Sequence, residues 1–255
     1  MASLSMNIEI FYLLLFIWCL FALITFFVLL YKPAPYGRHS NSFGPSVSGT
    51  WGWIAMEIPS VLVYPLIYFT SECFKETYSL VFLSLWEMHY LHRTFIYAWR
   101  RNNLLRPMPL SIIVLGMIFN CFNAFLNSYW INVISKCSLN GVTAPLFFIG
   151  IALFILGFVI NIVSDEKLLK LRQQGNFDYK IPLGGLYKYV SCPNYLGEVI
   201  EWFGFFLATL SPAAFTFFIW TSANLIPRAL SHHSWYRKFF PNYPRERKAI
   251  FPFLL

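Results

Sequence analysis

The sequence predicts an all-α, polytopic membrane protein with seven transmembrane helices. Its 255 residues are 58% apolar and only 12% charged, whereas soluble domains average about 45–50% apolar and about 25% charged residues. The apolar residues gather in long stretches, and most basic residues fall in every second connection between them. The composition therefore excludes a disordered chain, a collagen and a coiled coil, and it argues against an ordinary soluble domain.

Each apolar stretch is close to the roughly 20 residues with which a helix crosses about 30 Å of hydrocarbon. The first stretch follows no basic segment and is longer than the apolar region of a signal peptide, which has about 7–15 residues. We therefore expect it to be retained as a helix. The seven stretches are 9–31, 51–69, 78–99, 108–135, 143–165, 195–210 and 211–227.

Charge placement predicts the orientation in the membrane. Of the 19 Lys and Arg residues, 16 lie in four connecting segments, whereas the alternate loops carry only Lys75 and Lys136. The positive-inside rule then places the N-terminus in the lumen and the C-terminus in the cytosol. This topology accounts for the net charge of +8, so we expect no nucleic-acid partner. The basic segments are 32–50, 100–107, 166–194 and 228–255.

The connection 166–194 is the only long cytosolic loop in this topology, and its aromatic and apolar residues favour folding against another part of the protein. The five cysteines, at positions 19, 73, 121, 137 and 192, show no C-x-x-C spacing. We therefore expect no metal site. Cys73 and Cys137 fall in the two loops assigned to the oxidising lumen. The sequence leaves two alternatives open: a disulfide bridge between these cysteines, or two free thiols.

Ionisable residues inside predicted spans indicate a functional cavity, because each costs about 2.5 kcal/mol or more in hydrocarbon. Most of them fall in the cytosolic half, where a cavity could admit an apolar ligand from the bilayer and a polar one from the cytosol. The alternative is that these groups pair with one another, for instance Glu87 with Arg93, or extend to the headgroups. They are Glu57, Glu87, His89, His92, Arg93, Glu198 and Glu201.

Two polar stripes at helical spacing flank the long loop. One contains Asn161, Asp165 and Arg172, and the other contains Asn194 with Glu198 and Glu201. They could hold a large polar molecule, and three arginines are available for phosphate. The alternative is that these polar residues bind no ligand and simply form helix faces exposed to solvent. The chain has no G-x-G-x-x-G or P-loop pattern, so a nucleotide would need an unconventional site. The arginines are Arg172, Arg228 and Arg247.

The motifs together resemble those of the steroid 5α-reductases, NADPH-dependent oxidoreductases of the endoplasmic reticulum membrane. Met56, the Gly-Pro pair at 44–45 and the SCPNY segment at 191–195 are closer to the plant branch, which acts in brassinosteroid synthesis. The motifs are MEIPS at 56–60, HYLHRTFIY at 89–97, NIVSDEKLLKLR at 161–172, YKIPLGGLYKYVSCPNYLGEVIEW at 179–202 and the terminal NYPRERKAIFPFL.

The resemblance implies a single integral membrane reductase domain, 1–255, with a steroid cavity in its N-terminal half and an NADPH-binding half at about 143–255. It implies that Glu57 and Tyr90 polarise the steroid carbonyl, and that Trp53 and Met56 join them in contacting the steroid. It assigns contacts with NADPH to Tyr36, Arg93, Arg106, Asn161, Asp165, Arg172, Tyr179, Asn194, Glu198, Arg228, His232, Tyr236 and Arg247.

The implied reaction adds hydride to carbon 5 of a 3-oxo-Δ4 steroid, and negative charge builds on the 3-oxygen. A protonated Glu57 and the Tyr90 hydroxyl could each donate a hydrogen bond to that oxygen. Water or a side chain then protonates carbon 4. We expect a monomer in the bilayer. Two other functions fit parts of the pattern: reduction of another conjugated lipid, such as an enoyl thioester or a polyprenal, and transport or reception by a seven-span protein.

Overall fold

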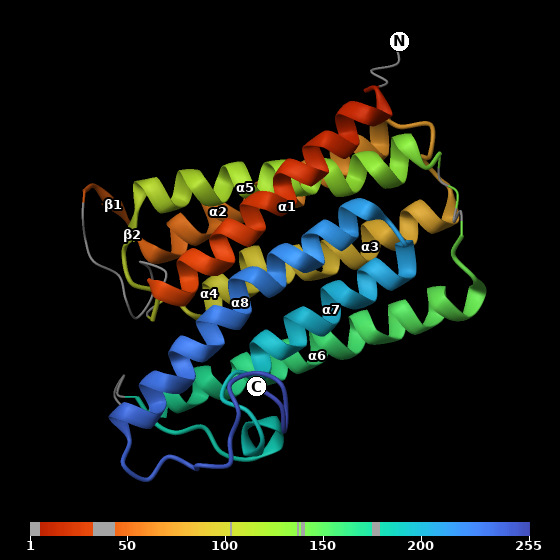
Figure 1. The fold of residues 1–255 in the computed structure, drawn as a ribbon. Coiled ribbons are helices and arrows are strands. Elements are labelled where there is room, and N and C mark those ends of the chain that lie inside the picture. Colours follow the sequence, from red (N-terminus) through yellow and green to blue (C-terminus); the bar gives the residue numbers. More distant parts are fainter. Residues whose placement is uncertain (1–5, 33–43, 103, 137, 139–140, 175–178) are drawn as a thin grey trace. The chain divides into compact units, whose positions relative to one another are not determined.

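The computed structural model describes residues 6–32, 44–102, 104–136, 138, 141–174 and 179–255, and these are predominantly helical (Figure 1). Two short strands pair as an antiparallel ladder, β1 (Ser46–Val47) with β2 (Met108–Pro109). The helices are α1 (Ile8–Tyr31), α2 (Gly49–Thr70), α3 (Thr77–Leu91), α4 (Ala98–Arg100), α5 (Leu110–Tyr129), α6 (Ala144–Gln174), α7 (Pro193–Thr209) and α8 (Pro212–Phe239). π-Helical turns follow α3 at His92–Tyr97 and α5 at Trp130–Ile134, and a 3-10 turn spans Gly185–Lys188.

The predicted helical class is confirmed, because every one of the seven apolar stretches falls on helical structure. Among the described residues, four helices are long and apolar enough to cross a membrane, judged by length and composition. This supports an all-α membrane protein, and the number of seven crossings stays a prediction. The four candidate spans are Ile8–Tyr31, Gly49–Thr70, Leu110–Ile134 and Ala144–Gln173.

Two helices extend beyond the predicted spans. Helix α6 continues past residue 165 to Gln174, because its last two turns consist of strong helix formers up to Gly175. Helical structure therefore occupies residues 166–174 of the predicted connection 166–194. Helix α8 continues through Pro227 to Phe239, one residue before the Phe240-Pro241 pair. A residue that precedes proline is disfavoured in the α region, which accounts for the end of this helix.

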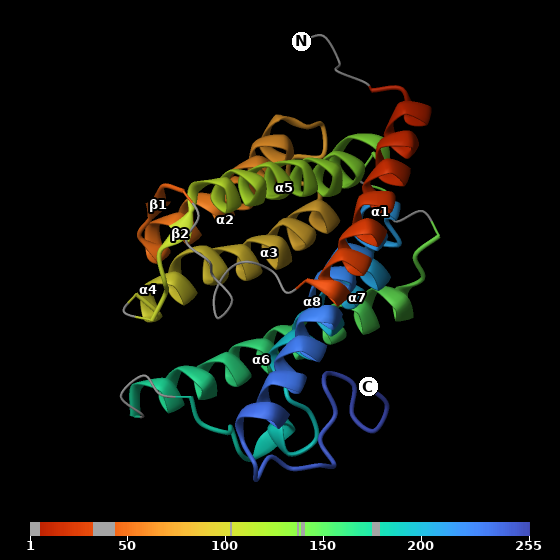
Figure 2. The same cartoon turned by 60° about the vertical axis from the view of Figure 1, so that its left-hand side comes forward.

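The chain divides into two compact units, and the first comprises 1–17, 35–143 and 209–214. In it α2 and α5 run side by side from the β1–β2 ladder, as both ribbon views show (Figures 1 and 2). Glycines permit their close approach. A Cβ atom on Gly52 would lie 2.9 Å from Ile113 Cδ1, and one on Gly116 would lie 2.2 Å from Met56 Cγ. Helix α3 joins them through Trp86 Nε1, which donates a hydrogen bond of 2.9 Å to Ser60 O.

The second unit comprises 18–34, 144–208 and 215–255. Its helices α6 and α7 each present glycines seven residues apart to the other. A Cβ atom on Gly157 would lie 2.4 Å from Glu201 N, and one on Gly204 would lie 2.4 Å from Phe154 N. The backbones therefore touch where a larger residue would separate them. The C-terminal segment pairs with the residues before α7, since Ser191 N donates to Lys248 O at 2.8 Å.

Cys73 is disulfide-bonded, whereas Cys19, Cys121 and Cys192 are the free cysteines of the described chain. Of the two alternatives left open by the sequence, a free thiol is therefore wrong for Cys73. Cys137 lies outside the described residues.

Candidate functional site

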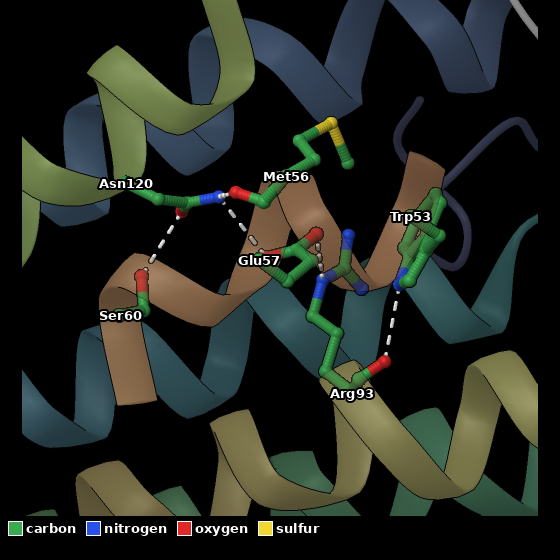
Figure 3. A network of polar contacts seen from close by, with 6 residues as sticks. All are labelled: Trp53, Met56, Glu57, Ser60, Arg93 and Asn120. Atoms are coloured by element: carbon green, nitrogen blue, oxygen red, sulfur yellow. Dashed lines mark hydrogen bonds and ion pairs between the residues drawn. The ribbon is translucent and has the colours of Figure 1, made fainter. Parts of the chain in front are cut away.

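The first unit contains a buried carboxyl group at its centre, contributed by Glu57 of α2. The residue is 4% exposed. Its two oxygens accept hydrogen bonds from two other helical segments: Arg93 Nε donates to Oε1 at 3.1 Å, and Asn120 Nδ2 donates to Oε2 at 3.2 Å (Figure 3). Ionisable groups are costly among apolar helices unless they are paired and hydrogen-bonded, and Glu57 meets both conditions.

Arg93 lies in the π-helical turn that follows α3, a distortion that frequently occurs at functional sites. Trp53 of α2 contacts Arg93 in two ways. Its indole Nε1 donates to Arg93 O at 3.1 Å, and the guanidinium carbon lies 5.1 Å from the centre of the indole ring. The ion pair of Arg93 with Glu57 differs from the pairing with Glu87 that the sequence offered as an alternative. Arg93 thus contacts both an aromatic face and the buried carboxyl group.

Tyr90 is placed by aromatic packing. It lies on α3, three residues before Arg93, and is 3% exposed. Its ring centre lies 4.8 Å from that of Trp86, and the Trp86 ring packs on Tyr64 at 4.9 Å. Trp86 also donates a hydrogen bond to Ser60 O of α2. The Trp86 indole therefore contacts both the Tyr90 ring and the helix that carries Glu57.

Of the residues predicted to contact the steroid, Trp53, Met56 and Glu57 lie within two turns of α2 and Tyr90 lies on α3. Sequence reasoning missed two partners of this group, Ser60 and Asn120. The available signal was an asparagine inside the apolar stretch 108–135, four residues after Gly116. The search for ionisable groups passed over neutral amides, which also need hydrogen-bond partners inside a membrane.

In the second unit the two predicted polar stripes meet. Asn161 Nδ2 of α6 donates to Asn194 O at 2.9 Å, and Asn194 Nδ2 donates in return to Asp165 Oδ1 at 3.0 Å. This network fixes the first turn of α7 against α6. Glu201 of α7 is fully buried, while Glu198 of the same helix is partly exposed.

Three predicted cofactor residues of α8 lie near aromatic rings of α7 and of the segment that follows α8. The guanidinium carbon of Arg228 lies 5.4 Å from the ring centre of Tyr195, and Tyr195 OH lies 3.2 Å from His232 Nε2. Tyr236 stacks on Tyr243 at 5.3 Å with an angle of 14° between the rings. Cation–π contacts of this kind position a guanidinium without neutralising its charge.

Arg247 is the most deeply buried arginine of the predicted set, at 3% exposure. Its guanidinium carbon lies 5.2 Å from the centre of the Tyr243 ring. Within the described chain, its buried Nε and Nη1 atoms donate no hydrogen bond. A buried guanidinium without an acceptor is unfavourable, so these donors fit a bound anionic group.

A second polar cluster anchors the C-terminal segment. Ser191 Oγ lies 2.6 Å from His233 Nδ1 and 2.7 Å from Tyr243 OH, and it donates to Lys248 O at 3.1 Å. Burial lowers the pKa of His233. Three neighbouring positive charges lower this pKa further: Arg237, Lys248 and Arg247.

The remaining predicted contacts are spread over both units. Arg172, near the end of α6, places its guanidinium carbon 5.3 Å from the ring centre of Tyr179, and that ring packs edge-on against Trp235 at 5.0 Å. Arg106, in the first unit, is exposed. Tyr36 lies outside the described residues, so its predicted contact has no structural counterpart.

Comparison with known proteins agrees with these motifs. Residues 106–255 match a family model described as 3-oxo-5-alpha-steroid 4-dehydrogenase. The chain is 39% identical to the steroid 5-alpha-reductase DET2 of Solanum lycopersicum, over 97% of this chain and 96% of the relative. It is 37% identical to the DET2 protein of Arabidopsis thaliana, over 94% and 96% of the two chains. It is 38% identical to the 3-oxo-5-alpha-steroid 4-dehydrogenase 2 of Homo sapiens, over 88% and 89%. The chain therefore belongs to the steroid 5α-reductase family of oxidoreductases.

Proposed function

We propose that this protein is an NADPH-dependent steroid 5α-reductase, which reduces the Δ4 double bond of a 3-oxo-Δ4 steroid to the 5α product. Family membership supports steroid reduction in general. The single observation that carries the chemical proposal is the carboxyl group of Glu57, which is 4% exposed and hydrogen-bonded at both oxygens. Such a fixed polar group among apolar helices suits an apolar substrate with one carbonyl oxygen.

The reaction requires a place for negative charge. When bound, NADPH supplies the hydride, which forms the new bond at carbon 5 while the electron pair of the double bond moves through carbon 4 onto the 3-oxygen. Glu57 and Tyr90 would donate hydrogen bonds to that oxygen as charge builds on it. A proton from water or a side chain completes the reduction at carbon 4. Trp53, one turn before Glu57 on α2, and Met56, the residue next to it, would contact the steroid rings.

The second unit is proposed to bind the cofactor. Arg247 offers two buried donors to an anionic group, and the guanidinium groups of Arg228 and Arg172 lie on aromatic rings. Arginine suits phosphate because its planar donors can bind two oxygens together. Arg93, for which the resemblance implied a cofactor contact, pairs here with Glu57. The other proposed contacts are Arg106, Asn161, Asp165, Tyr179, Asn194, Glu198, His232 and Tyr236, with Tyr36 outside the described residues.

We further propose a single reductase domain that crosses the endoplasmic reticulum membrane seven times, with a lumenal N-terminus and a cytosolic C-terminus. The four long apolar helices and the alternation of basic loops support this placement. A disulfide at Cys73 also supports it, because the loop 71–76 is assigned to the oxidising side.

The decisive experiment uses the full chain purified in detergent or nanodiscs. Reduction removes the conjugated enone, so the ultraviolet absorbance of a 3-oxo-Δ4 steroid should fall in step with oxidation of NADPH. A parallel assay offers an enoyl thioester and a polyprenal. Turnover of either in place of the steroid would replace the proposed substrate, and no turnover with any substrate would argue against the enzymatic proposal.

A further inference from the structure

We propose that Asn120 of α5 is a positioning residue, which holds the carboxyl group of Glu57 in the orientation that the reaction needs. This inference rests on the proposed function, because it assigns a role within the same site. It starts from the hydrogen bonds of one amide group, which joins α5 to two consecutive residues of α2 (Figure 3).

The amide of Asn120 uses both of its donor hydrogens and its acceptor. Nδ2 donates to Met56 O at 2.8 Å and to Glu57 Oε2 at 3.2 Å, and Oδ1 accepts from Ser60 Oγ at 3.1 Å. A flipped amide would point Oδ1 at two acceptor oxygens and would point Nδ2 at the Ser60 hydroxyl. The contacts therefore determine the orientation of the amide.

Burial prevents water from replacing these contacts. Asn120 is 5% exposed and Ser60 is 0% exposed. The Asn120 amide contacts a backbone carbonyl and a side-chain oxygen of adjacent residues, so it fixes the main chain at Met56 together with the carboxyl group of Glu57. Gly116, one turn earlier on α5, leaves room for the Met56 side chain at the same contact. The close approach of α2 and α5 thus brings the amide to the carboxyl group.

Two donors from different helical segments define the plane of the Glu57 carboxyl group. Arg93 Nε binds Oε1 and Asn120 Nδ2 binds Oε2, so rotation of the carboxyl group would break at least one bond. The remaining lone pairs then keep a fixed direction in which a proton can be held for the substrate oxygen. Catalytic groups lose much of their effect when they are loosely held, because small errors in position are costly.

Another asparagine on the same helix provides a matched control. Asn123 is fully buried, and the hydrogen bonds that it receives come from Asn127 on the same helix: Asn127 Nδ2 donates to Asn123 O at 3.0 Å and to its Oδ1 at 3.2 Å. Asn120 and Asn123 are thus both buried amides of α5, and Asn120 binds Glu57.

The test compares Asn120→Leu with Asn123→Leu, because leucine keeps the side-chain volume and removes the amide. We expect Asn120→Leu to lower kcat for the steroid by roughly 10-fold, the effect of losing about one hydrogen bond. The KM for NADPH should change by less than about twofold. Asn123→Leu should leave kcat close to the wild-type value. Equal losses of kcat in both variants would overturn the positioning role in favour of general packing.

A double-mutant cycle shows whether Asn120 acts through Glu57. In a Glu57→Gln background, Asn120→Leu should cause little further loss of kcat, because the group that it positions has already been changed. Fully additive losses would overturn the inference. Should Asn120→Leu fail to fold, Ser60→Ala provides the test, since it releases the Asn120 amide without removing it. Ser60→Ala should also lower kcat, by a smaller factor than Asn120→Leu. An unchanged kcat would contradict the inference.

The wild-type assay separates the two levels of the proposal. If the wild type reduces the steroid and both Asn120→Leu and Ser60→Ala retain its kcat, the positioning role alone is wrong. If the wild type reduces none of the substrates offered, the proposed function is wrong and the positioning role is overturned with it.

Discussion

Arg93 Nε lies 3.1 Å from Glu57 Oε1, and this ion pair joins the π-helical turn after α3 to the middle of α2. The guanidinium group is partly exposed, while the carboxyl group is nearly fully buried. One partner therefore faces a more open environment than the other. Removal of the arginine would leave a buried carboxyl group with a single donor, whereas removal of the carboxyl group would leave a cation on the Trp53 ring.

Replacement of the two proposed hydrogen-bond donors should slow the chemical step. We expect Glu57→Gln and Tyr90→Phe each to lower kcat for a 3-oxo-Δ4 steroid by roughly 10²-fold or more, comparable with the loss of one oxyanion donor. Binding of NADPH, followed by its fluorescence, should change little. Steady-state kinetics on the purified variants measure this, and wild-type turnover in both would remove these residues from the mechanism.

Loss of the buried guanidinium should weaken cofactor binding. Arg247→Met keeps an unbranched side chain and removes the charge, so we expect the KM for NADPH to rise by about 10-fold or more, the effect of losing charge-assisted hydrogen bonds. Arg245→Met is the matched control, because Arg245 is exposed in the same segment. Equal effects of the two substitutions on the KM would contradict a specific role for Arg247.

Two further cofactor predictions follow from the arginines and amides of the second unit. We expect Arg172→Ala and Arg228→Ala mainly to raise the KM for NADPH, and Asn194→Ala also to weaken binding, because it loses the bond to Asp165. NADPH carries a 2′-phosphate that NADH lacks, so an arginine-rich site should prefer it. Comparison of kcat/KM for the two cofactors measures this preference, and equal use of both would argue against the assignment.

The sequence predicted the features that depend on residues close together in the chain, and it missed contacts between residues far apart in it. The helical class and the two polar stripes that contain Asn161 and Asn194 followed from local hydropathy and helical spacing. The bond between Asn120 and Glu57 joins residues 63 positions apart, and it depends on the close approach of two helices. No local pattern specifies that approach. The ion pair of Arg93 also depends on a π-helical turn at 92–97, which the regular helical period did not predict.

The docking of the C-terminal segment should depend on pH through His233. Its pKa is lower in the folded protein than the ordinary value of about 6.5, so the unfolded state binds the proton more readily. The stability that His233 contributes is therefore fully present above about pH 6.5 and is lost as the pH falls toward the lowered pKa. A protonated ring would also face Arg237, Lys248 and Arg247.

Limited proteolysis of the segment 240–255 measures this effect. Cleavage should accelerate between about pH 7.5 and about pH 5.5, the interval that spans the ordinary histidine pKa. His233→Gln removes the titration and keeps a polar partner for Ser191, so its cleavage rate should depend less on pH. An equal acceleration in the variant would assign the effect to another group.

The glycine contacts between α6 and α7 should be sensitive to a single methyl group. Gly→Ala gains up to about 1 kcal/mol of helix propensity, but a Cβ atom on Gly157 would lie 2.4 Å from the backbone nitrogen of Glu201, which cannot rotate away. Overpacking typically costs about 1–3 kcal/mol. We therefore expect Gly157→Ala to lower the thermal unfolding temperature in detergent. Gly116→Ala is the comparison, because its Cβ atom would meet the flexible side chain of Met56, and a larger loss there would contradict this reasoning.

The disulfide of Cys73 provides the test of membrane orientation. The sequence assigns Cys73 and Cys137 to the same lumenal side, so the bridge to test is the one between them. A non-reducing digest should therefore yield one linked peptide that contains both. In sealed microsomes with the cytosolic face outward, an impermeant reductant should leave the bond intact until detergent is added, since the bridge would lie in the oxidising lumen. An Arg245→Cys variant, exposed in the basic tail, should react with an impermeant thiol reagent in the same vesicles. Reduction of the bond in intact vesicles, with the tail protected, would reverse the orientation and place the arginines of the second unit on the lumenal side.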